Sequence, residues 1–213
     1  MNTANFWHLL TRLGEAEILL PVTLIAVVML LRRAEGRPLA AWWTALLMAA
    51  VLLTTATKVA FIGWGVGSAA LNFTGSSGHA MFAGAVYPVL FTTLASSGSR
   101  RVRTWAIAAG FLLALMIGIS RVVIGVHSES EVVAGLFLGG AVSALTFSQV
   151  KMPLASVSPL TLVALAAWMS FTPAPGPVSP THALVTRLAL KLSGHTQPYT
   201  RGDMLRSARK VDS

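Results

Sequence analysis

Long apolar stretches recur along this sequence, and they restrict the fold more than any other feature. A helix needs roughly 20 predominantly apolar residues to cross the hydrocarbon core of a bilayer. Lipid offers no hydrogen-bond partner to the backbone, so such stretches satisfy their peptide groups internally, as helices. Six of them are predicted, at Ile18–Leu31, Ala40–Thr57, His79–Ala95, Thr104–Ile119, Val132–Val150 and Leu154–Phe171. We therefore expect an all-α fold, a polytopic membrane helix bundle with about six transmembrane helices.

The composition agrees with a membrane protein. Of the 213 residues, 54% are hydrophobic and only 11% are charged, whereas soluble domains carry about 25% charged residues. The chain has no cysteine, which excludes disulfides, thiol catalysis and cysteine-ligated zinc. Its net charge of +9 is spread over short loops and a tail. This pattern favours membrane lipids or an anionic lipid substrate as partners, and not nucleic acid.

The sequence predicts two parts with different character. Residues 1–172 form a membrane-embedded domain, which opens with "NFWHLLTRLG", typical of a short interfacial helix with aromatic anchors. Residues 173–213 form a basic tail outside the membrane, in which "HALVTRLALKLSG" has helical spacing. Leucines share one face of this segment and cations lie on another, as in a helix resting on a membrane surface: Leu184, Leu188 and Leu192 against Arg187 and Lys191.

The distribution of charge predicts an orientation. Basic residues gather in the loops on one side of a six-helix bundle, which the positive-inside rule makes cytoplasmic: Arg32, Arg33, Arg37, Arg100, Arg101, Arg103 and Lys151. A second polar set then falls at helix ends on the outer face: Lys58, Ser77, His79, Arg121, His127 and Glu131. Ionisable side chains at the edge of a membrane are costly and by default indicate a functional site.

The stretch "LNFTGSSGHAMFAG" leads into the third apolar run. A glycine-serine turn at a helix N-terminus presents free backbone N–H groups and the positive end of the helix dipole, which suits a bound anion. Serine and glycine also cap helices for purely structural reasons. The adjacent His79 favours the anion site, because its ring can donate to a bound oxyanion.

The stretch "SRVVIGVHSESE" precedes the fifth apolar run. Arg121 offers a fork of donors suited to phosphate, and His127 can act as a nucleophile if its other ring nitrogen is held. Glu131 follows four residues later, on the same helical face, where a carboxylate can orient the imidazole. Ser128 and Glu131 also have the spacing of a capping box. Glu131 is therefore a candidate for catalysis or for helix capping, and Arg121 alone could be an interfacial anchor.

These residues resemble the type 2 phosphatidic acid phosphatase family. "SSGH" and "SRVVIGVHSESE" are similar to its second and third signatures, P-S-G-H and S-R-x5-H-x3-D. Its first signature, K-x6-R-P, lies at the end of the preceding helix, and Lys58 in "TKVAFIGWG" stands in that place. The resemblance covers roughly Lys58 to Val150.

The resemblance implies a helical bundle that hydrolyses lipid phosphates or diphosphates at a membrane surface, without a metal or other cofactor. In this family pattern, His127 would attack phosphorus and form a phosphohistidine, and His79 would protonate the leaving oxygen. Glu131 would take the place of the aspartate. The phosphoryl oxygens would be held by Lys58, Ser77, Gly78 and Arg121. The substrate would be an anionic phospholipid or an isoprenoid phosphate or diphosphate.

The chain departs from the pattern at several positions. Gly65 and Val66 stand where the first signature has Arg-Pro, so one phosphate-binding cation is missing. Ser76 replaces the proline of the second signature, and glutamate replaces aspartate in the third. Arg201 in "QPYTRGD" is a candidate donor for the missing cation, or a plain surface arginine.

The sequence is compatible with three functions. The first is a phosphatase acting on an isoprenoid diphosphate, a glycerolipid phosphate or a lipid A phosphate. The second is phosphotransfer to another lipid through the same phosphohistidine. The third is an inactive lipid-binding or structural relative that has lost the arginine. Retention of both histidines, Arg121 and Lys58 argues against inactivity. Haloperoxidases share the constellation, but they are soluble.

Overall fold

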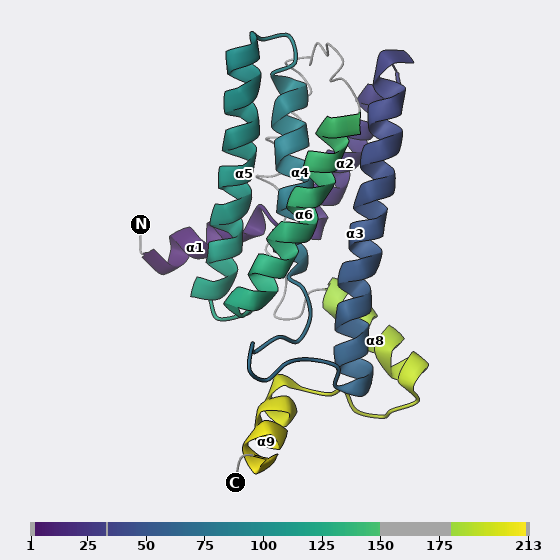
Figure 1. The fold of residues 1–213 in the computed structure, drawn as a ribbon, viewed down its shortest axis with the longest axis vertical. Coiled ribbons are helices and arrows are strands. Elements are labelled where there is room, and N and C mark those ends of the chain that lie inside the picture. The colour runs from purple at the N-terminus through teal and green to yellow at the C-terminus, as the bar shows by residue number, and fades with distance from the viewer. Residues whose placement is uncertain (1–2, 33, 150–179, 212–213) are drawn as a thin grey trace.

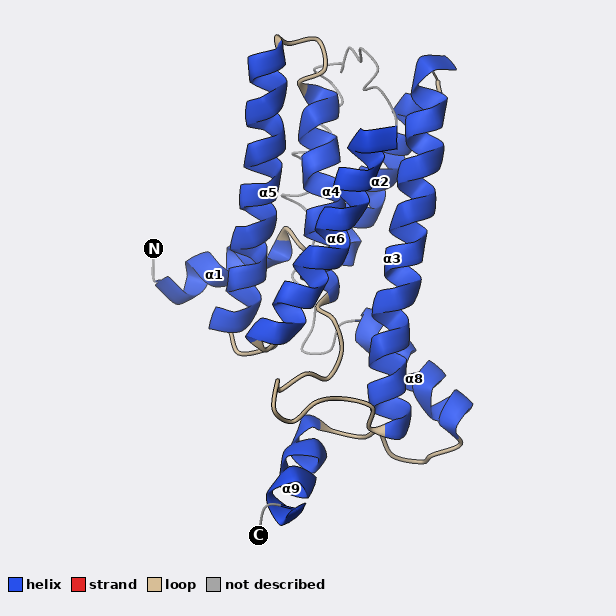
Figure 2. Ribbon diagram, viewed as in Figure 1, coloured by secondary structure: helices blue, strands red, loops and turns tan. Residues whose placement is uncertain are grey.

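The protein is a bundle of helices (Figures 1 and 2), seen in a computed structural model that describes residues 3–32, 34–149 and 180–211. No β-strand occurs in these ranges, where a single isolated bridge pairs Ser68 with Phe73. The elements in chain order are α1 (Thr3–Arg12), α2 (Ala16–Leu31), the 3-10 turn η1 (Ala34–Gly36), α3 (Arg37–Trp64), α4 (Gly78–Leu94), α5 (Arg100–Val123), α6 (Glu129–Gln149), α8 (Pro180–Ser193) and α9 (Arg201–Val211).

The apolar stretches form the long helices, which confirms the predicted helical membrane bundle. In the described ranges, four helical stretches have the length and composition to cross a membrane, and α4 is a shorter apolar helix. The four are Asn5–Leu31, Ala34–Trp64, Arg100–Val123 and Glu129–Gln149. The sixth predicted stretch, Leu154–Phe171, lies outside the described residues.

One predicted boundary was wrong in a way that matters for the site. The second apolar run was expected to end at about Thr57. Helix α3 continues through Lys58 and ends only at Gly65, whose φ of 71° is the left-handed conformation of a helix C-cap. The extra turns carry Lys58 inside a helix and place the C-terminal end of α3 next to the tail.

Helix α4 forms the centre of the bundle and packs against α5 and α6 (Figure 1). The contact with α6 depends on glycine, because a Cβ on Gly135 would lie 2.4 Å from the carbonyl oxygen of Ser77, and one on Gly139 would lie 2.1 Å from that of Met81. Small residues of this kind let membrane helices approach closely. The close packing fixes the start of α6 beside the start of α4.

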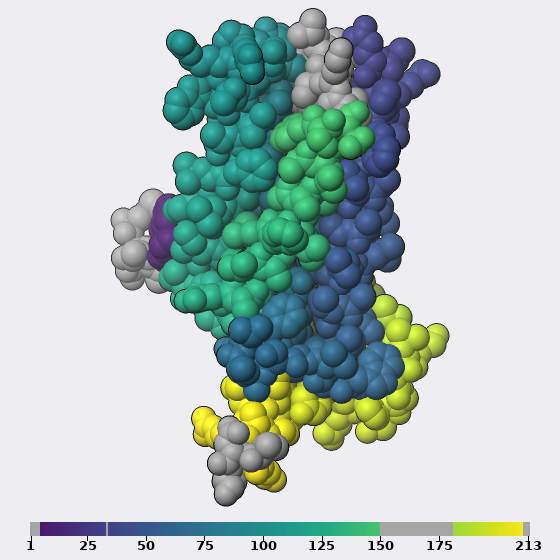
Figure 3. All heavy atoms as spheres, in the orientation of Figure 1, coloured from purple at the N-terminus to yellow at the C-terminus, as the bar shows by residue number. Residues whose placement is uncertain are grey.

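The tail elements α8 and α9 lie at the end of the bundle where α3 ends and α4 begins (Figures 1 and 3). A second hydrophobic cluster joins them to α3, formed by Val59, Phe61, Ile62, Ala189 and Met204. The leucine face predicted for α8 points away from this cluster, since Leu184, Leu188 and Leu192 are exposed. The described tail therefore packs on the bundle through Ala189 and Met204, whereas the predicted leucine face of α8 stays exposed.

Candidate active site

A cavity of about 840 Å³ opens at the end of the bundle that carries the tail. Helices α2, α3, α4, α5, α6, α8 and α9 contribute to its lining, together with the loop that follows α3. Six of the predicted site residues line it: Lys58, Gly78, His79, Arg121, His127 and Glu131. Segments far apart in the sequence thus meet in one cavity at one end of the bundle.

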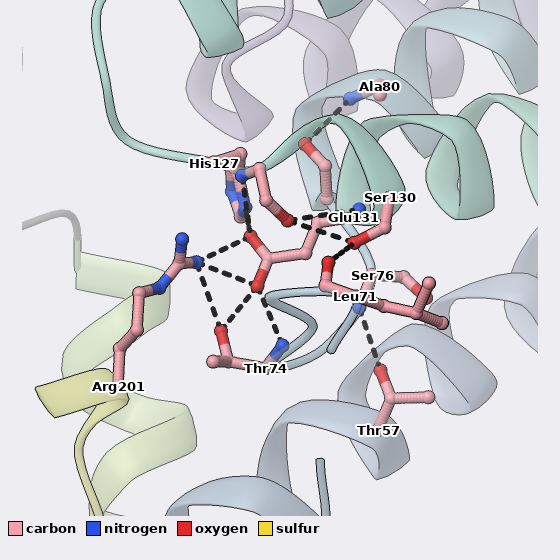
Figure 4. Close-up of polar contacts among 11 residues, drawn as sticks. Thr57, Leu71, Thr74, Ser76, Ala80, His127, Ser130, Glu131 and Arg201 are labelled. Carbon is pink, nitrogen blue, oxygen red and sulfur yellow. Dashed lines mark hydrogen bonds and ion pairs between the residues drawn. The ribbon is translucent and has the colours of Figure 1, made fainter. Parts of the chain in front are cut away.

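His127 and Glu131 form the most defined pair in the cavity. The chain leaves α5 through Gly125, with φ of 73°, and α6 begins at Glu129, so His127 lies just before a helix and Glu131 in its first turn. Nδ1 of His127 lies 2.7 Å from Oε2 of Glu131 (Figure 4). With Nδ1 donating to the carboxylate, Nε2 carries the free lone pair. The geometry is that of an oriented nucleophile or base.

The protonation state of His127 suits this arrangement. Burial lowers the pKa of His127 from its usual value of 6.5, while the hydrogen bond to Glu131 raises it and the charges of Lys58 and Arg121 lower it further. The net direction is downward. The imidazole is therefore neutral near pH 7, with a lone pair available for attack.

Glu131 is fully buried and accepts hydrogen bonds from several directions. Thr74 donates to Oε1 from its backbone N–H at 2.8 Å and from its hydroxyl at 2.5 Å. The capping box also forms, since Ser128 N donates to Oε2 at 3.2 Å and Glu131 N donates to Ser128 Oγ at 3.4 Å. The same carboxylate therefore caps α6 and contacts His127.

The glycine-serine turn packs around Lys58. A Cβ on Gly78 would lie 3.6 Å from Nζ of Lys58, so the ammonium group lies beside the N-terminus of α4. Gly75 has φ of 129°, which favours glycine, and a Cβ there would lie 2.9 Å from Cγ of Lys58. A cation and a helix N-terminus thus face the same part of the cavity, and both favour an anion.

Ser77 occupies a different place from the other predicted phosphate ligands. Its side chain is fully buried and accepts from Ala80 N at 3.5 Å, as an N-cap of α4. Its backbone N–H donates to the carbonyl oxygen of Glu131 at 2.9 Å. Ser77 is absent from the cavity lining. In this structure it joins the starts of α4 and α6 and does not face the cavity.

Arg121 reaches the cavity from the last turn of α5. Its Nη1 donates to the hydroxyl of Thr11 at 2.9 Å, so α1 supports the guanidinium from one side. Neither Thr11 nor Thr74 was predicted from the sequence. The sequence could have indicated Thr74, because it lies in the same glycine-serine stretch as His79. Thr11 is far from every motif in the sequence.

Arg201 lies at the site and not on a remote surface. Its Nη2 is 2.7 Å from Oε1 and 2.8 Å from Oε2 of Glu131 (Figure 4), although the side chain is 34% exposed. It also lines the cavity.

The described residues contain no group of three histidine, aspartate or glutamate side chains placed to hold a metal ion.

These features define a helical membrane bundle with an oriented histidine and several cations around one cavity. A sequence model of the PAP2 superfamily matches residues 64–154, a segment that includes both histidines, Arg121 and Glu131 and begins after Lys58. The chain is also 34% identical over 211 residues to an uncharacterized 22.5 kDa protein in the cps region of Klebsiella pneumoniae, covering 95% of this chain and 99% of that protein. No solved structure matches. The chain belongs to the PAP2 superfamily, which supports phosphatase activity.

Proposed function

We propose that the protein hydrolyses a lipid phosphate or diphosphate through a phosphohistidine, without a metal ion. The observation that carries this proposal is the 2.7 Å contact between His127 and Glu131 inside a cavity that Lys58 and Arg121 also line. Phosphoryl transfer needs positioning and charge stabilisation, and cations with backbone donors can supply both.

The reaction proceeds in two displacements at phosphorus. Nε2 of His127 forms a bond to phosphorus as the bond to the leaving oxygen breaks, and His79 passes a proton to that oxygen. Glu131 stabilises the positive charge that develops on the imidazole. Water then attacks the phosphohistidine and gives a proton to His79, so that inorganic phosphate leaves and His127 is regenerated.

The phosphoryl oxygens are held by the cations and by the start of α4. Lys58 and Arg121 offset the charge that spreads over these oxygens, and the backbone N–H of Gly78 lies at the positive end of the α4 helix dipole. We assign Ser77 an indirect role, because its hydroxyl caps α4. It keeps the glycine-serine turn in place for the groups that contact phosphate.

The remaining lining supports a lipid as substrate. The cavity is also lined by apolar side chains of α3, α4 and α8: Val51, Phe61, Ile62, Met81, Phe82, Leu184 and Val185. A soluble phosphoester needs no such surface, whereas an acyl or isoprenoid chain gains by burying against it. Phosphatidic acid, an isoprenoid diphosphate and a lipid A phosphate all share a phosphate next to an apolar chain.

We place the protein in the cell membrane as a multi-pass protein with the site on the outer face. Of the predicted basic loop residues that the structure describes, Arg32 precedes α3, whereas the others lie in the first turns of α3 and α5: Arg37, Arg100, Arg101 and Arg103. These helix starts are at the opposite end of the bundle from the tail and the cavity (Figure 1). A cysteine at Glu129 is expected to react with an impermeant thiol reagent from outside, and one at Ser99 only after permeabilisation. The absence of native cysteine keeps the background clean, and the reverse pattern would put the site on the inner face.

The activity is tested with purified protein in detergent micelles containing a chelator. Inorganic phosphate is measured after incubation with phosphatidic acid, an isoprenoid diphosphate and a phosphorylated lipid A, with His127→Ala as the matched control. We expect release from at least one lipid by the wild type alone. Transfer of phosphate to a second lipid, without release, would instead identify a phosphotransferase. No turnover of any lipid would favour the inactive lipid-binding relative.

A further inference from the structure

The end of α3 has lost a side chain at the position where the family signature has an arginine. Gly65 is the seventh residue after Lys58, and it caps α3 with φ of 71°. A Cβ built there would lie 2.9 Å from Cε1 of Tyr199 and 3.1 Å from two further ring atoms. The ring of a tail residue thus occupies the space that any side chain at this position would enter.

The tail is attached to this helix end by several contacts. Tyr199 N donates to the carbonyl oxygen of Ile62 at 2.9 Å, and its ring packs edge-to-face on Phe61 with centroids 5.7 Å apart. His195 Nδ1 lies 2.8 Å from the carbonyl oxygen of Gly63. These contacts satisfy carbonyl groups that the end of α3 would otherwise leave without partners. The tail therefore has a fixed path past the cavity.

This path ends in a capped helix whose first residue is Arg201. Thr200 donates to Oδ2 of Asp203 from its N–H at 2.9 Å and from its hydroxyl at 2.5 Å, and Asp203 N donates back to Thr200 Oγ1 at 3.2 Å. This reciprocal cap fixes the start of α9. Met204 is buried in the cluster against α3. The direction in which Arg201 leaves the helix is thereby set.

The guanidinium of Arg201 has N–H donors that make no hydrogen bond to the described residues. Its Nη2 alone contacts both oxygens of Glu131 and, at 3.3 Å, the hydroxyl of Thr74 (Figure 4). Among the described residues, Nε and Nη1 have no hydrogen-bond partner. An arginine carries five N–H donors in a fixed fork, and this one lines the cavity with Lys58 and Arg121.

We propose that Arg201 supplies, from the tail, the phosphate-binding cation that the end of α3 lacks, and that Tyr199 is its positioning residue. The inference rests on the proposed function and names one further ligand of the phosphoryl group. Glu131 holds Nη2 of Arg201, and the N–H groups of Nε and Nη1 face the phosphate. A phosphate dianion then contacts three cations, each from a different helix. Arg201 replaces the arginine that the family has at the position of Gly65, because the tail packs into the space that the side chain of such an arginine would occupy.

The test measures the binding of inorganic phosphate to the purified full-length protein by calorimetry, independently of turnover. Arg201→Ala is expected to weaken binding about tenfold to a hundredfold, as for the loss of a charged hydrogen bond, and Arg201→Lys less. Added guanidinium should restore part of the affinity in Arg201→Ala, whereas sodium chloride at equal concentration should not. The matched control is Arg209→Ala, which removes an exposed cation from the same helix and should leave binding unchanged.

Tyr199→Ala tests the positioning role. It should weaken phosphate binding through Arg201, so the double variant Tyr199→Ala with Arg201→Ala should bind phosphate no more weakly than Arg201→Ala alone. Additive losses would overturn that role.

Two results would overturn the assignment of Arg201 itself. One is wild-type phosphate affinity in Arg201→Ala, even if turnover falls, because the arginine would then only hold Glu131. The other is an equal loss in Arg209→Ala, which would reduce the effect to general charge. A wild type that hydrolyses no lipid, but whose phosphate affinity depends on Arg201, would refute the phosphatase proposal and leave the anion ligand standing.

Discussion

The two halves of the cavity are built in different ways. The half that contains the proposed nucleophile, called the nucleophile half here, is formed by Arg121, His127 and Glu131. These residues come from one stretch of the chain, and the spacing of that stretch sets their geometry. The other half, in which we propose that the anion binds and which is called the anion half here, joins Lys58 from α3 to Arg201 from the tail. Packing between segments more than a hundred residues apart brings these two residues together. Where local spacing sets the geometry, a site residue can be replaced only by a substitution at its own position. Where packing between distant segments sets the geometry, a residue from another part of the chain can take over the role of one that is lost.

Removing the nucleophile should have the largest effect on turnover. His127→Ala is expected to lower phosphate release by at least about a thousandfold, because the covalent route is lost. Lys58, Arg121 and Arg201 are untouched, so binding of inorganic phosphate should persist and separate the two halves. Turnover within about tenfold of the wild type would show that His127 is not the nucleophile. The contrast between the two halves of the cavity would then have no basis.

Glu131 joins the two halves, so its substitution should come next in size. Glu131→Gln keeps the capping box but removes the charge that faces His127 and Arg201, and we expect turnover to fall by about a hundredfold or more. Glu131→Asp restores the family's residue and should retain more activity than glutamine.

Ser128→Ala is the control for the helix cap. It removes the other side of the capping box at a cost of about 1 kcal/mol in helix stability, and turnover should stay within a few-fold of the wild type. If glutamine preserved activity while Ser128→Ala abolished it, Glu131 would be only a cap.

The loss of activity at low pH tests the nucleophile half. Burial lowers the pKa of His127 from 6.5, and only the neutral imidazole has a lone pair on Nε2. The ratio kcat/KM should therefore show no loss from His127 at neutral pH and should fall about tenfold per pH unit below the folded pKa, as protonation removes the nucleophile. A loss that begins above pH 7 would mean a raised pKa and an imidazole held in its charged form.

The same contrast explains what the sequence could and could not predict. Long apolar runs predicted the bundle, and the short signatures predicted the residues that line the cavity, because both depend on local spacing. Ser77 was assigned to the phosphate because it stands in a signature, and the structure shows its hydroxyl turned to the cap of α4. Thr11 and the place of Arg201 depend on how α1 and α9 dock. No spacing within one segment records that, so Arg201 could only be a candidate.

The smallest expected effect tests the anion half at the helix end itself. Gly65 and Gly194 have nearly equal φ, 71° and 73°, but a Cβ on Gly65 meets the ring of Tyr199 while one on Gly194 meets nothing within 4 Å. Alanine at either position adds the same backbone strain, on the order of 1 kcal/mol.

Only Gly65→Ala should also displace Tyr199 and move Arg201, so we expect its affinity for inorganic phosphate to fall about three- to tenfold below that of Gly194→Ala. Thermal unfolding of both variants checks that each remains folded before the affinities are compared. Equal affinities in the two variants would mean that the end of α3 can change without moving the arginine. The cation would then be held by Glu131 alone, and the docking of the tail would not set its position.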